Sequence, residues 1–271
     1  MARRSSGWWW IAGVIVLAAV IAGWLYSAYQ RAQPIAAPTT AAKPAPASTA
    51  PPPIQHPIEH VATAPAPAST APLPALSDSD DAVLQALSAL PGADGLKALL
   101  LPQAIIPRIV ATVDALPRQQ VGNNILPLRT PPGTFQTAEV NGQRVIGERN
   151  AERYAAYMRL VEAVDTRAAV AWYVHYYPLF QQAYRDLGYP KGYFNDRLIA
   201  VIDHLLAAPD VKPPVALAQP KVFYTYADPT LEARSFGQKA MIRIGADNEA
   251  RLKAKLREIR AALAGQTLPA R

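Results

Sequence analysis

Four polar residues of one predicted helix have the types and spacing of a site that could transfer protons. Asp196 and Asp203 are seven residues apart, and Arg197 and His204 repeat that spacing one position later. Because seven residues make almost two helical turns, the two pairs would lie on neighbouring stripes of one helix face. Such a face could perform acid–base chemistry or hold a polar ligand. A structural alternative stays open, in which Asn195 or Asp196 caps the helix and the others form ion pairs or hydrogen bonds.

Tyrosines are concentrated around this helix. Ten of the 12 tyrosines lie between Tyr154 and Tyr226. A tyrosine ring has a flat apolar face and a polar tip, which suits stacking on a sugar or gripping a peptide. A buried core with satisfied hydroxyl groups would give the same pattern, and both interpretations stay open. The candidate ligand- or partner-binding residues are Tyr177, Tyr184, Tyr193, Asn195, Asp196, Arg197, Asp203 and His204.

The sequence carries no strong catalytic motif and predicts neither a cofactor nor a metal site. GxSxG, HExxH, a Walker loop and GxGxxG are all absent. The 271 residues include no cysteine, which excludes a thiol nucleophile, disulfide bonds and thiolate metal ligands. A zinc site would need His175 and His204 to converge with carboxylates from separate helices, and the spacing does not predict this. The catalytic residues, if any exist, are therefore unknown.

A predicted multi-helix globular domain, residues 76–264, holds these candidate residues. Apolar residues recur through most of it at spacings of three and four, which predicts helices with one face in a core. Pro178 lies inside the longest of them, where a proline is expected to kink the helix. The helices are predicted at residues 77–90, 96–101, 105–116, 148–164, 166–187, 195–207, 229–242 and 247–263.

The last predicted helix separates apolar from basic residues. Leu252, Leu256 and Ile259 recur at helical spacing and are expected to face the core, with Leu263. A basic face of this kind is typical of a solvated surface or of contact with an anionic partner. The basic residues expected to point mostly outward are Arg251, Lys253, Lys255, Arg257 and Arg260.

The predicted β-structure is small. Asn141-Gly142 lies between two short extended runs, which is a strong local signal for a β-hairpin. Residues 215–217 and 222–226 are further candidates for short strands. The predicted fold class is therefore mainly α: a single transmembrane helix, a disordered linker, and a multi-helix globular domain with a small β-hairpin and short strands.

Residues 8–26 are predicted to form the transmembrane helix. The run WWWIAGVIVLAAVIAGWLY holds no charged residue, and its roughly 19 residues would reach nearly 30 Å, about one hydrocarbon core. Arg3 and Arg4 precede it, so residues 1–7 are expected in the cytoplasm and the C-terminal domain in the periplasm. A cleaved signal peptide is the alternative, although its apolar region would normally be about 7–15 residues long.

Residues 27–75 are predicted to be a disordered linker rich in proline and alanine. The block PAPASTAP occurs at residues 44–51 and again at 65–72, and a short polar run, Gln55 to His60, lies between the copies. Proline removes amide donors, and few large apolar residues are present to offset the entropy of ordering. This composition favours a semi-rigid tether, and residues 265–271 are predicted to be a flexible tail.

Several runs in the domain carry a resemblance to a known family. The chain resembles a proteobacterial membrane-anchored family classed as a domain of unknown function, over roughly residues 75–263. The resemblance implies a single-pass inner-membrane protein that faces the periplasm, and it implies no activity and no catalytic residue. The runs are YPLFQQAY (177–184), LGYP (187–190), GYFNDRL (192–198), VIDHLL (201–206), PKV (220–222), YADP (226–229) and GQK (237–239).

Two functions from different classes follow from these observations. The favoured one is a non-catalytic envelope module, held out on its tether, that binds an envelope protein or cell-wall glycan. The alternative is a peptidoglycan hydrolase or lyase that uses carboxylates of residues 195–207 as acid or base. The formal net charge of +7 is a mild bias, and with the predicted location it gives no reason to expect nucleic acid as a partner.

Overall fold

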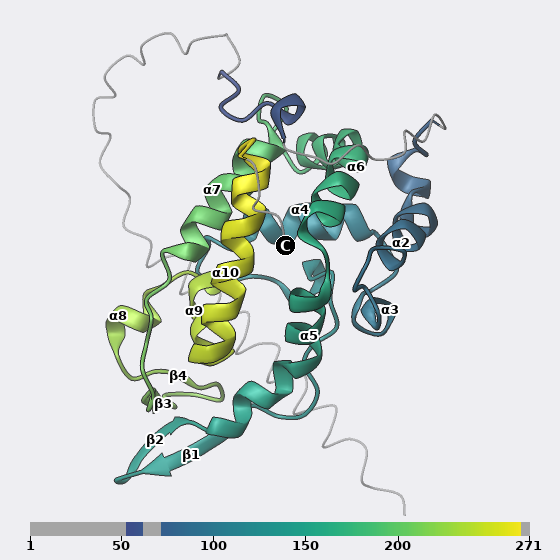
Figure 1. Ribbon diagram of the computed structural model, residues 1–271. Helices are drawn as coiled ribbons and strands as arrows, with labels where there is room; N and C mark the ends of the chain where they lie inside the picture. The colour runs from purple at the N-terminus through teal and green to yellow at the C-terminus, as the bar shows by residue number, and fades with distance from the viewer. Residues whose placement is uncertain (1–52, 62–71, 267–271) are drawn as a thin grey trace, which may run out of the picture. The chain divides into compact units, whose positions relative to one another are not determined.

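The computed structural model describes residues 53–61 and 72–266 (Figure 1). The predicted membrane helix, the predicted cytoplasmic tail and most of the predicted linker lie outside the described residues. Within the described part, no helix combines the length and the apolar character that crossing a membrane requires.

The described residues form a mainly helical domain with two small antiparallel sheets, as the sequence predicted. Most helix ends fall close to the predicted positions. The elements are η1 (Ile58–His60), η2 (Leu76–Asp78), α2 (Asp80–Ser88), α3 (Leu96–Leu99), α4 (Ile105–Ala115), η3 (Asn123–Ile125), β1 (Thr137–Val140), β2 (Gln143–Ile146), η4 (Glu148–Tyr154), α5 (Ala155–Ala163), α6 (Thr166–Asp186), α7 (Phe194–Leu206), β3 (Leu217–Ala218), β4 (Thr225–Tyr226), α8 (Pro229–Glu232), α9 (Phe236–Arg243) and α10 (Ala246–Leu263).

The core lies where α4, α6, α7 and α10 pack against one another (Figure 1). Phe180 of α6 stacks on Phe194 of α7, with ring centroids 5.6 Å apart. Tyr173, Tyr176 and Tyr184 of α6 are also buried in this cluster. For these three tyrosines the structure therefore supports the interpretation as core residues.

α6 begins and ends almost where the sequence predicted. The Asp165 side chain accepts a hydrogen bond from the Ala168 backbone N–H at 2.8 Å, which satisfies one of the free amides of the first turn. Pro178 lies inside the helix without ending it. The long helix consequently presents its aromatic residues to α7 over their whole shared length.

The predicted hairpin is confirmed. β1 and β2 pair antiparallel, with Val140 opposite Gln143, and Asn141 and Gly142 both have positive φ as a tight two-residue turn requires. β3 and β4 also pair, over only two residues each. The predicted strand at 222–226 is thus shorter than expected, because Val222 and Phe223 are largely exposed.

The single helix predicted at residues 229–242 is two helices, α8 and α9. Ser235 caps α9 by accepting from the Gln238 backbone N–H at 3.1 Å. The backbone N–H of Gly237 donates to the Leu116 carbonyl oxygen at 2.9 Å, just beyond the end of α4. These contacts with another segment fix a new helix start that local spacing could not reveal.

Two lysines of α10 that were predicted to point outward are wrong in that respect. Lys253 is buried, and its Nζ lies 2.8 Å from Glu249 Oε1. Lys255 donates to the Val164 carbonyl oxygen at 3.1 Å. The long stems of these lysines cross the packed face and place their charges on oxygen atoms of neighbouring elements.

An apolar cavity of about 270 Å³ lies inside the helical core. Ala169 of α6 and Leu198 of α7 line it, and so does Trp172, whose buried indole N–H has no hydrogen-bond partner within the described residues. Native cores rarely leave voids much larger than a water molecule. This volume therefore represents packing that the fold does not use.

Replacing Ala169 with leucine is expected to raise the free energy of unfolding by about 0.5–1 kcal/mol, because it fills part of this cavity. Ala200→Leu, on the exposed side of α7, is the matched control and should change stability by less than about 0.5 kcal/mol. Chemical denaturation followed by circular dichroism measures both. A loss of stability in Ala169→Leu would contradict the prediction.

Candidate functional site

A buried glutamine fixes the start of α7. The Gln181 side chain of α6 accepts from the Phe194 backbone N–H at 3.0 Å and donates to the Gly192 carbonyl oxygen at 2.8 Å. The Tyr177 hydroxyl donates to the same Gln181 oxygen at 2.9 Å. Tyr193, in an extended conformation, is the last residue before the helix. The GYFNDR run is thus held against α6 by side chains that the sequence places 11 or more residues earlier.

Asn195 and Asp196 bind main-chain atoms of a distant part of the chain. The Asp196 carboxylate accepts from the backbone N–H groups of Gln55 and His56, at 3.1 and 2.7 Å. The Asn195 side-chain amide donates to the His56 carbonyl oxygen at 2.9 Å. Asn195 is itself fully buried, and the Tyr173 hydroxyl lies 3.3 Å from its Oδ1. These two consecutive residues therefore form a clamp for peptide backbone.

The bound stretch, residues 53–61, is called the docked segment below. Figure 1 shows it in dark blue, next to the start of α7 that the hydrogen bonds identify. Ile58 packs against the helical core, and Val61 is buried in it, 8% exposed. The His60 carbonyl oxygen lies close to Gly265, just beyond α10. Part of the predicted linker therefore packs onto the domain.

Arg197 points to α4 and away from the clamp. Its Nε donates to Asp114 Oδ1 at 3.0 Å, and its Nη2 donates to the Asp114 carbonyl oxygen at 2.7 Å. Asp114 is buried, and it also accepts from the Tyr189 hydroxyl at 3.1 Å and pairs with Arg118. Tyr184 stacks on Tyr189, with ring centroids 4.6 Å apart. Arg197 and Tyr184 thus belong to a structural network between α4, α6 and α7.

Asp203 and His204 have separate partners again. Asp203 forms a two-bond ion pair with Arg260 of α10, and one of the bonds, to Nη2, is 3.0 Å long. His204 Nε2 lies 2.8 Å from the Ser235 hydroxyl oxygen, at the cap of α9. Desolvation, with the nearby Arg197 charge, lowers the pKa of His204. The predicted stripe is therefore divided among four different neighbours and does not form one site.

The comparison with known proteins identifies the family. The family model described as a protein of unknown function, DUF3014, matches residues 105–260. The chain belongs to the DUF3014 family. No curated protein and no solved structure matches the chain. The match confirms the resemblance to a domain of unknown function, and it includes the clamp but not the docked segment.

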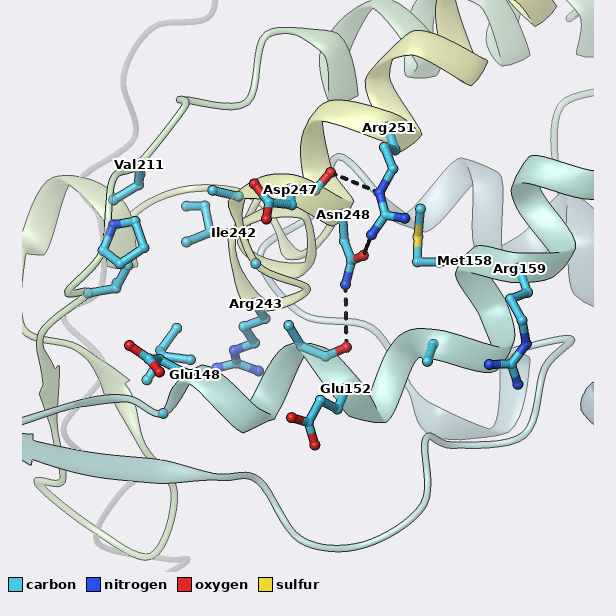
Figure 2. A pocket seen from close by; sticks show the side chains of 18 of the residues that line it. Glu148, Glu152, Met158, Arg159, Val211, Ile242, Arg243, Asp247, Asn248 and Arg251 are labelled. Carbon is cyan, nitrogen blue, oxygen red and sulfur yellow. Dashed lines mark hydrogen bonds between the residues drawn. The ribbon is translucent and has the colours of Figure 1, made fainter.

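A larger cleft, of about 580 Å³, lies within the DUF3014 region, between η4 and α5 on one side and the start of α10 on the other. Figure 2 shows Arg251 bonded to Asn248 and to the Asp247 main chain on one wall, with Glu148 and Glu152 along the other. Arg251 also pairs with Glu162 at 2.8 Å. The cleft carries both signs of charge, and none of its residues was among the sequence candidates.

The described part of this DUF3014 protein shows no metal centre. Among residues 53–61 and 72–266, no three His, Cys, Asp or Glu side chains come together as metal ligands would. His175 and His204 lie in different surroundings, since His175 packs edge-to-face on Tyr176. The arrangement at α7 is suited to hydrogen bonding with peptide groups rather than to holding an ion.

The docked segment is the functional feature that the sequence analysis did not predict. The signal is the short polar run at residues 55–60, where Ile58 and Val61 interrupt the tract of small residues and prolines. Averaged over the linker, two aliphatic residues have no weight. Their spacing of three matches one turn of helix, and η1 uses it to bring both side chains to the core.

Proposed function

We propose that this chain is a membrane-anchored envelope protein whose helical domain is a non-catalytic binding or scaffolding module. The observation that carries the proposal is the division of the candidate polar residues among separate partners. Asp203 is bound to Arg260, Arg197 to Asp114, and His204 to Ser235. Only the clamp directs its polar atoms at a peptide, and its ligand is main chain.

The proposed location rests on the sequence. The uncharged run at residues 8–26 is long enough for one membrane span, and Arg3 and Arg4 precede it. This orientation places the N-terminus in the cytoplasm of a bacterial cell and the DUF3014 region in the periplasm. The partner is accordingly an envelope protein or cell-wall glycan.

The geometry argues against a two-carboxylate hydrolase on α7. The acid and base of a glycosidase flank one bond, with carboxyl groups at most about 9.5 Å apart. Asp196 and Asp203 are separated by about 10.5 Å along the helix axis. Their carboxylates also bind different groups, the docked segment and Arg260. A shared substrate would have to displace both sets of bonds at once.

Peptidoglycan sacculi provide the test. The full chain, purified in a mild detergent, is incubated with intact sacculi and spun down, and soluble products are identified by mass spectrometry. The expected result is that wild type releases no muropeptides. Release that is lost in folded Asp196→Asn or Asp203→Asn would overturn the non-catalytic proposal. Sedimentation with the sacculi indicates a glycan partner, and its absence directs the search to proteins, by crosslinking in the envelope.

A further inference from the structure

We infer that the start of α7 is a binding site for extended peptides, which the chain's own docked segment occupies and from which a partner peptide displaces it. The inference rests on the proposed function, because it names the class of partner that the module binds.

The clamp recognises peptide backbone rather than a side chain. Its three hydrogen bonds use two consecutive N–H groups, of Gln55 and His56, and the carbonyl group of His56. Hydrogen bonds to an ionised carboxylate are stronger than those between neutral groups. Any peptide that presents N–H, N–H and C=O in this order can therefore make the same polar contacts.

Side chains that follow the clamped residues supply the selectivity. Pro57 has an extended ψ of 136° and precedes the turn of η1. This turn brings Ile58 and Val61 against the core cluster. The ligand class is thus a short peptide with two free amides, a proline next, and aliphatic residues one and four positions after that proline.

The clamp is prepared by the domain itself. Tyr173 contacts the Asn195 side chain, and Gln181 holds the backbone at Phe194. All of these groups come from α6 and α7, not from the docked segment. Side chains fixed in this way lose little entropy on binding, so the site favours a ligand whether it comes from the same chain or from another molecule.

The docked segment competes with a partner at an advantage. Because it is part of the same chain, its effective concentration at the site is on the order of millimolar. A partner peptide must exceed this advantage or act when the segment is released. Release also lengthens the stretch between the clamp and residues 8–26, so partner binding and the reach of the domain are coupled.

The first experiment measures binding of a fluorescent peptide with the sequence of residues 53–61, PIQHPIEHV, blocked at both ends. The full chain with Ile58→Ser and Val61→Ser provides an emptied site, and circular dichroism establishes that it is folded. This variant is expected to bind the peptide at least about tenfold more tightly than wild type. No binding to the folded, emptied variant would overturn the inference.

Two substitutions on α7 then locate the site. In the emptied variant, Asp196→Asn removes the charged acceptor of two hydrogen bonds and is expected to weaken peptide binding about tenfold or more. Asp203→Asn is the matched control, because it lies on the same helix and is bonded to Arg260. It should leave the affinity unchanged. Equal losses in both variants would contradict the assignment to the clamp.

Two peptides separate backbone recognition from side-chain recognition. A peptide with His56→Ala keeps the N–H that Asp196 accepts, and its affinity should stay within about threefold. A peptide with His56→Pro lacks this N–H and should bind about tenfold more weakly or worse. The opposite ranking would refute the backbone clamp. The sacculus assay is independent: loss of peptide binding leaves the non-catalytic proposal standing, and muropeptide release leaves a peptide site standing.

Discussion

Replacing Lys253 with methionine is expected to lower the free energy of unfolding by about 3–5 kcal/mol. The Lys253 side chain is 4% exposed and Glu249 is 3% exposed, with Nζ 2.8 Å from Oε1. Lys253 also donates to the Ala208 carbonyl oxygen at 2.7 Å and to Asp210 at 2.6 Å. Methionine keeps most of the stem but removes the cation. The Glu249 carboxylate is then buried without a compensating charge.

Two further variants test this explanation. Glu249→Gln combined with Lys253→Met removes both charges, and it should restore much of the stability that the single change loses. Arg257→Met, on the exposed side of the same helix, should change the free energy of unfolding by less than about 0.5 kcal/mol. Urea denaturation measures all three. A single Lys253→Met change that costs no more than Arg257→Met would show that the buried pair is not needed.

The same pair predicts how stability responds to alkali. Desolvation lowers the pKa of Lys253, but its hydrogen bonds with Asp210 and Glu249 outweigh this, so the pKa lies above the ordinary 10.5. A group with a raised folded-state pKa stabilises the protein fully below its unfolded pKa, and the contribution is lost as the pH rises through the folded value. Wild type should therefore lose stability above about pH 10.5, and Lys253→Met should lose less over that range.

Local pattern predicted the elements of this fold better than their partners. The apolar spacing located α4, α6, α7 and α10, and Asn141-Gly142 located the hairpin, because each signal lies within the element it describes. The stripe on α7 failed as a single site for the opposite reason. Asp203 binds Arg260, 57 residues away, and Arg197 binds Asp114, 83 residues away. No spacing within a helix contains that information.

The docked segment shows the same difficulty at longer range. Asp196 binds His56, 140 residues away, through backbone groups that every residue except proline possesses. A residue type therefore gives no hint of the contact. What the sequence does offer is negative: Gln55 and His56 lie between Pro53 and Pro57 in a proline-rich tract, and they retain the amides that a proline would remove.

Gly92→Ala is expected to cost about 3 kcal/mol of stability, more than its conformation alone explains. Gly92 has a φ of +80°, and a Cβ added there would lie 1.9 Å from the Ala163 carbonyl oxygen and 2.9 Å from the Val164 backbone nitrogen. The left-handed conformation accounts for about 1–2 kcal/mol. The remainder comes from displacing backbone, which cannot rotate out of the way as a side chain can.

Gly95→Ala isolates the second contribution. Gly95 has nearly the same φ, +85°, but an added Cβ would meet no atom within 4 Å. It should cost only the conformational part, about 1–2 kcal/mol, and the difference between the two variants in urea denaturation measures the steric part. Equal costs would refute the close approach at Gly92. A larger cost at Gly92 has a structural consequence as well, because the Asp165 backbone N–H donates to the Pro91 carbonyl oxygen at 3.1 Å. Asp165 is also the cap of α6, so a shift at Gly92 would disturb the start of the helix that positions α7 and its clamp.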